Sequence, residues 1–69
     1  MKGYISNNTG NRFVKLSRIT EFTIVPKSSE YWKITAWLND TDSFIVSDSF
    51  KSRTTAEEYL GLILERKEN

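Results

Sequence analysis

The sequence predicts a small α+β domain in which an antiparallel sheet packs against one C-terminal helix. Two observations support this fold class. Short segments with alternating apolar residues fill the first three quarters of the 69-residue chain and are separated by turn residues, which is typical of strands in hairpins. From residue 53 the apolar residues recur at helical spacing instead. Because every connection is short, we expect a β-meander of four to five strands, forming one domain over residues 1–69.

The first half of the chain contains three of the expected strands. A short apolar stretch at residues 2–6 is followed by the turn sequence NNTGN, which predicts a hairpin to a second strand at residues 12–17. Residues 18–27 are rich in the β-branched and aromatic types that favour strands. Pro26 cannot donate to a central ladder, so we expect it at the end of this third strand.

The clearest strand signal is residues 31–38, YWKITAWL. Side chains of a strand point alternately to its two faces, so the two tryptophans lie on opposite faces. One face is apolar throughout, and we assign it to the core: Trp32, Ile34, Ala36 and Leu38. The outer face then carries Tyr31, Lys33, Thr35 and Trp37. After the turn NDTD, residues 43–49 predict the last strand.

The helix is expected to begin near residue 54. Thr54 and Thr55 each stand three positions before a glutamate, which is the spacing of a capping box. At about 100° per residue, one broad stripe of the helix is apolar: Ala56, Tyr59, Leu60, Ile63 and Leu64. Leu62 lies outside that stripe beside Gly61. This pair either has no role or lets another backbone approach the helix closely.

The expected core draws on every segment from the second strand to the helix: Leu16, Ile19, Phe22, Ile24, Trp32, Ile34, Ala36, Val46, Phe50, Ala56, Leu60 and Ile63. A sheet of four or five strands is roughly 15 to 20 Å wide, whereas one helix spans about 10 to 12 Å. Either the sheet curls around the helix, or a second copy covers the remainder in a homodimer.

Composition excludes several classes of function. Ten basic residues against nine acidic ones give no strong overall field, and the absence of cysteine and histidine removes thiol chemistry, common zinc ligands and the commonest general base. We therefore expect no enzyme, no catalytic residue, no cofactor and no metal, with Asp40 and Asp42 acting as turn residues. The N-terminus has no apolar stretch typical of a signal peptide and no segment could span a bilayer, so we expect a cytoplasmic protein without a membrane partner.

Three hypotheses for function remain. The first is a non-enzymatic protein-binding or regulatory module, whose partner is another protein or a second copy and whose contact residues are Tyr31, Lys33, Trp37 and Leu62. The second is a weak binder of single-stranded nucleic acid. Residues 1–20 hold four basic residues and no acid, and the contacts would be Arg12, Lys15 and Arg18 beside the sheet aromatics. The third is a structural homo-oligomer.

The order of the segments YISNNTG, VKLSRITEFTI, YWKITAWL and FIVSDSFKSRTTAEEYLGLIL resembles short uncharacterised proteins of phages and prophages of Gram-positive bacteria. In those proteins a leucine-x-x-isoleucine corner, here Leu16 to Ile19, precedes the meander. An aromatic residue and a helix opening on alanine follow the last strand, here Phe50 and Ala56. The resemblance covers nearly the whole chain and rests on apolar positions. It implies a meander packed on a C-terminal helix and a small accessory or regulatory role, with no active residues to transfer.

Overall fold

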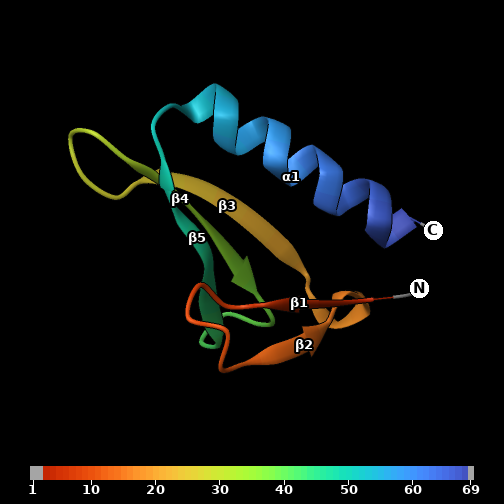
Figure 1. The fold of residues 1–69 in the computed structure, drawn as a ribbon. Helices are drawn as coiled ribbons and strands as arrows, with labels where there is room; N and C mark the ends of the chain where they lie inside the picture. Colours follow the sequence, from red (N-terminus) through yellow and green to blue (C-terminus); the bar gives the residue numbers. More distant parts are fainter. Residues whose placement is uncertain (1–2, 69) are drawn as a thin grey trace.

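The computed structural model describes the backbone of residues 3–68 and side chains up to residue 65 (Figure 1). Within that range, five antiparallel strands form two sheets, and a C-terminal helix packs against the strands. The α+β class is confirmed. In chain order the elements are β1 (Tyr4–Ser6), β2 (Phe13–Lys15), the 3-10 helix η1 (Leu16–Arg18), β3 (Glu21–Pro26), β4 (Trp32–Trp37), β5 (Ser43–Phe50) and α1 (Arg53–Glu68).

Strands β1 and β2 form the expected N-terminal hairpin. The Asn7 side-chain oxygen accepts the backbone N–H groups of Asn11 and Arg12 at 3.0 and 3.3 Å, which fixes the turn. Gly10 has φ 77°, a left-handed conformation that a side chain would strain. The pairing places Ile5 opposite Val14, and both are buried.

The strands do not form one continuous meander, because the chain turns sharply between β2 and β3. Leu16 and Ile19 are buried at this corner, and the Ile19 N–H donates to the Leu16 carbonyl at 3.1 Å. The corner separates a two-stranded sheet, β1–β2, from a three-stranded sheet with the order β3–β4–β5. The segment from Leu16 to Ile19 is therefore a corner at which the chain changes direction, and it does not belong to a strand.

The three-stranded sheet has the predicted phase. Ile34 and Ala36 are completely buried, and Trp32 and Leu38 pack against the same core. Lys33, Thr35 and Trp37 consequently lie on the other face. The register between β4 and β5 shifts at two places, which increases local twist and bends the sheet.

On the inner face of the three-stranded sheet, the hairpin covers the part that α1 does not. Ile5 and Val14 of the hairpin belong to the same core cluster as Ala56 and Ile63 of the helix. In Figure 1, α1 runs along the upper part of the view and the hairpin along the lower part, with the three-stranded sheet beside both. Every residue of the predicted core is buried or packs against the cluster, which also holds Ile5, Val14 and Phe44.

The helix differs from expectation at its start and along its margin. Ser52 caps it, because its Oγ accepts the Thr55 N–H at 3.1 Å, so the predicted capping by Thr54 or Thr55 is wrong. Tyr59 and Leu64, expected in the apolar stripe, are each more than 40% exposed. The buried side of α1 is narrower than the sequence stripe and consists of Ala56, Leu60 and Ile63.

Ser52→Ala is expected to lower the free energy of unfolding by about 1 kcal/mol, because the Thr55 N–H in the first turn loses its acceptor. In a domain of this size the melting temperature should fall by roughly 4–8 °C, measured by circular dichroism. Thr54→Ala is the matched control and should change stability by less than about 0.5 kcal/mol. A larger loss in the control than in Ser52→Ala would contradict the assignment of the cap.

Candidate functional site

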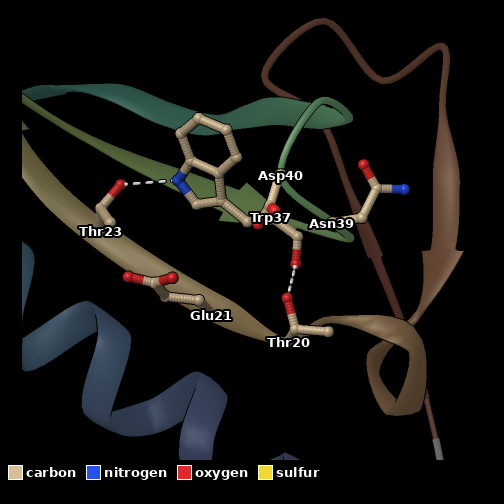
Figure 2. Close-up of a pocket in the computed structure, with 6 residues that line it drawn as sticks. All are labelled: Thr20, Glu21, Thr23, Trp37, Asn39 and Asp40. Atoms are coloured by element: carbon tan, nitrogen blue, oxygen red, sulfur yellow. Dashed lines mark hydrogen bonds between the residues drawn. The ribbon is translucent and has the colours of Figure 1, made fainter.

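The outer face of the three-stranded sheet contains an open hollow of about 260 Å³ beside Trp37 (Figure 2). It lies where β3 begins and β4 ends, on the face that α1 does not cover. Six residues line it: Thr20, Glu21, Thr23, Trp37, Asn39 and Asp40. The hollow therefore combines one large aromatic ring with small polar groups and two carboxylates.

Trp37 is held in a defined position by β3. Its Nε1–H donates to the Thr23 Oγ1 at 3.1 Å, and its carbonyl accepts the backbone N–H and hydroxyl of Thr20 at 2.8 and 3.0 Å. In the strand register Trp37 stands opposite Glu21. Thr35, two residues earlier on the same face, is only 9% exposed. The indole thus packs on the outer face of the sheet and also lines the hollow.

The loop after β4 closes the other side of the hollow. Asn39 organises this loop, because its Oδ1 accepts the backbone N–H groups of Thr41 and Asp42 at 2.9 and 2.8 Å. Asp40 lies within the loop and is exposed, as is Glu21 on β3. Since no basic residue lines the hollow, its formal charge comes from these two carboxylates alone.

The predicted protein-contact residues are not all on one surface. Lys33 and Trp37 share the outer face of β4 and flank Thr35. Tyr31 precedes β4 and borders a second open hollow with Lys51. Leu62 is 61% exposed on α1, the element that packs on the opposite face of the sheet. The structure therefore brings two of the four predicted residues onto the Trp37 face and leaves Leu62 away from it.

The three basic residues predicted for nucleic-acid contact have different environments. Arg12 forms a two-pronged ion pair with Asp42, with N–O distances of 3.2 and 3.0 Å, and lies over the Phe44 ring at 5.3 Å. It thereby joins the hairpin to the start of β5. Lys15 and Arg18 are exposed, in β2 and η1 respectively.

Two exposed aromatic residues on the hairpin and the polar half of the hollow were not predicted from the sequence. Tyr4 and Phe13 are 55% and 67% exposed on the outer face of β1–β2, where Tyr4 stands opposite Lys15. At the hollow, the position of Glu21 follows from its pairing with Trp37, a register that single-strand periodicity does not give. Asp40 is placed by the Asn39 turn.

The Arg12–Asp42 pair predicts a response to acid. The hydrogen bond from Arg12 lowers the pKa of Asp42 below its ordinary value of 3.8, partial desolvation opposes that shift, and the charges of Arg12 and Arg18 reinforce it. Because the folded-state pKa is the lower one, the pair stabilises the fold above pH 3.8, and this stabilisation is lost as the pH falls through the folded-state value.

Asp42→Asn should therefore be less stable than the wild type near neutral pH, and the gap should close as the pH falls below about 4. Urea unfolding across that range measures it. Asp40→Asn, in the same loop without the Arg12 contact, should leave a smaller gap at neutral pH. An Asp42→Asn gap that stays constant as the pH is lowered through the acid range would show that the ion pair does not link folding to protonation.

Comparison with known protein families, with curated proteins and with solved structures finds no match to this chain. The case for a function accordingly rests on the chain's own residues and their arrangement. Across the part of the chain that the structure describes, no helix is long and apolar enough to cross a membrane.

Proposed function

We propose that this chain is a small non-enzymatic binding protein that recognises another protein through the outer face of the β3–β4–β5 sheet. The observation that supports the proposal is Trp37, which lines an open hollow on the face opposite the helix. Tryptophan is enriched among residues that dominate binding energy at protein interfaces, where a large ring enters or forms a pocket. Lys33, on the same face of β4, would supply part of the polar rim.

The chemistry of the chain favours binding over catalysis. It has no histidine or cysteine, and the lowered pKa of Asp42 is explained by its structural pairing with Arg12. The absence of cysteine suits a reducing interior, so we place this contact in the cytoplasm. A small accessory role of this kind is also what the resemblance to phage and prophage proteins implies.

Affinity capture from the native host tests the proposal. The tagged wild type should retain a partner that Trp37→Ala loses, with the circular dichroism spectrum unchanged. Because that variant also removes the bond to Thr23, Thr23→Val is needed to separate loss of the bond from loss of the ring. Leu64→Ala, which truncates an exposed apolar residue on α1, should behave as the wild type. Retention of every partner by Trp37→Ala contradicts the proposal, and sedimentation shows whether the partner is a second copy.

A second candidate function is supported by the outer face of the hairpin. Tyr4 and Phe13 expose their rings there, and Lys15 stands opposite Tyr4. Exposed rings next to basic residues are the means by which proteins bind single-stranded nucleic acid, with bases stacked on the rings and cations near the phosphates. Because Arg12 is paired with Asp42, the cations of this candidate surface are Lys15 and Arg18 rather than all three predicted residues.

Fluorescence anisotropy with a labelled oligothymidine measures this second function. Binding through phosphates should weaken steeply between about 50 and 200 mM salt. Phe13→Ala should weaken it further, whereas Leu62→Ala, which truncates an exposed apolar residue on the helix, should not. Absence of binding at the lower salt concentration, or equal binding by Phe13→Ala, would remove the hairpin surface as a nucleic-acid site.

A further inference from the structure

We propose that the hollow beside Trp37 binds the guanidinium group of an arginine side chain that a partner protein presents. This inference rests on the proposed function, because it names the chemistry of the partner at the same face. Three properties of the hollow support it: its charge, the fixed orientation of its ring, and its size.

The charge of the hollow is negative and not neutralised from within. Glu21 and Asp40 both line it. Among side chains up to residue 65, the described ion pairs of Asp42, Asp48 and Glu57 involve Arg12, Lys27 and Arg53, and neither Glu21 nor Asp40 takes part in one. Because the two carboxylates are exposed, they lose little hydration when a cation binds, and the desolvation cost of binding is small. A planar guanidinium has five N–H donors and no acceptor, so it can donate hydrogen bonds to carboxylates that lie in different directions.

The ring of Trp37 is the second and independent feature. Its only donor, Nε1–H, is already used by Thr23, so the ring has no polar hydrogen left for a ligand. That bond and the pairing with β3 also fix the orientation of the indole before binding. The remaining contact of the ring with the hollow is its π system, which attracts cations and stacks with guanidinium groups.

The size of the hollow favours a side chain over a free ligand. At about 260 Å³ it is smaller than the roughly 300–1,000 Å³ of pockets that enclose drug-sized molecules. It is also open, and its acidic lining opposes a phosphate or a nucleic acid. A single basic side chain on the surface of a partner protein suits a hollow that is small, open and acidic. Contacts around the hollow would supply the rest of the affinity.

The occupant can be tested with a peptide of fixed chemistry. The probe is acetyl-Gly-Arg-Gly-amide, and its matched control has citrulline, which keeps the shape of arginine without the charge. In a nitrogen–proton correlation spectrum the indole signal of Trp37 is assigned by its absence in Trp37→Phe. We expect the arginine peptide to shift this signal saturably while the citrulline peptide does not. Glu21→Gln and Asp40→Asn should each weaken the arginine peptide by roughly twofold to fivefold.

The following results with the peptides would overturn the inference. An equal shift with citrulline, or saturable binding of a neutral disaccharide without binding of arginine, would mean that the hollow recognises a neutral group. The absence of any shift would mean that it is not a site for a basic side chain. Failure of the proposed function can be distinguished from failure of this inference. If a captured partner needs Trp37 but still binds the Glu21→Gln/Asp40→Asn double variant, the docking face is supported and the arginine inference is overturned. If the arginine peptide shifts the signal but no partner is captured, the cation site is supported and the proposed function is not.

Discussion

Ile34→Ala is expected to destabilise the domain by about 2–5 kcal/mol, a large fraction of the stability of a small domain. Ile34 is completely buried in β4, the central strand of its sheet, and belongs to the cluster that contains Ala56 and Ile63 of α1. Truncation would leave a cavity bounded by two layers of structure that cannot collapse freely onto it. A chain of 69 residues has few other contacts with which to compensate.

Urea unfolding followed by tryptophan fluorescence measures this loss. Val25→Ala is the matched control, because it also shortens a β-branched strand residue, but one that is 37% exposed on the edge strand β3. The control should cost less than about 0.5–1 kcal/mol. A cost for Ile34→Ala as small as that of Val25→Ala would mean that the inner face of β4 has been assigned wrongly.

The phase of β4 connects the core to the candidate site. If Ile34 and Ala36 point inward, then alternation places Trp37 on the outer face, where the hollow lies. This much follows from the sequence, because four consecutive alternate positions of YWKITAWL are apolar and the opposite set is mixed. A period of two is a local signal, and a local signal is sufficient for a strand buried on one face.

Features that depend on distant parts of the chain were not predictable in the same way. The sequence does not show that Ile5 and Val14 complete the core, since their hairpin must first fold back over the sheet. Nor does periodicity distinguish the corner at Leu16–Arg18 from continued strand, so two sheets were read as one. The cap was predicted at the wrong residue, because Ser52 accepts the Thr55 N–H of the first turn without the glutamate that the capping-box pattern requires.

Charge was the least reliable guide to the site. Counting basic residues over the N-terminal segment treats Arg12 as available, whereas Asp42, thirty residues later, pairs with it. Conversely, Glu21 and Asp40 looked unremarkable in sequence, and only the β3–β4 register and the Asn39 turn place them beside Trp37. Net charge along a chain says little about the field at one face when the partners come from separate elements.

The inclusion of the hairpin in the core leads to the last prediction, that Leu16→Ala destabilises both sheets together. Leu16 is completely buried at the corner between them, and its N–H donates to the Gly3 carbonyl at 3.2 Å. Its truncation should cost about 2–5 kcal/mol and lower the protection of amides in the hairpin and in β4 by similar amounts. Hydrogen exchange under native conditions measures both regions in one experiment.

Ser17→Ala is the matched control, because Ser17 is exposed in the same 3-10 turn and its loss leaves the buried corner intact. It should leave exchange in both regions close to that of the wild type. If Leu16→Ala instead opens the hairpin amides while β4 keeps its protection, the hairpin is a separate unit resting on a sheet that is stable without it. In that case the sheet and helix alone would support the outer face, and the docking face proposed at Trp37 would form whether or not the hairpin is folded.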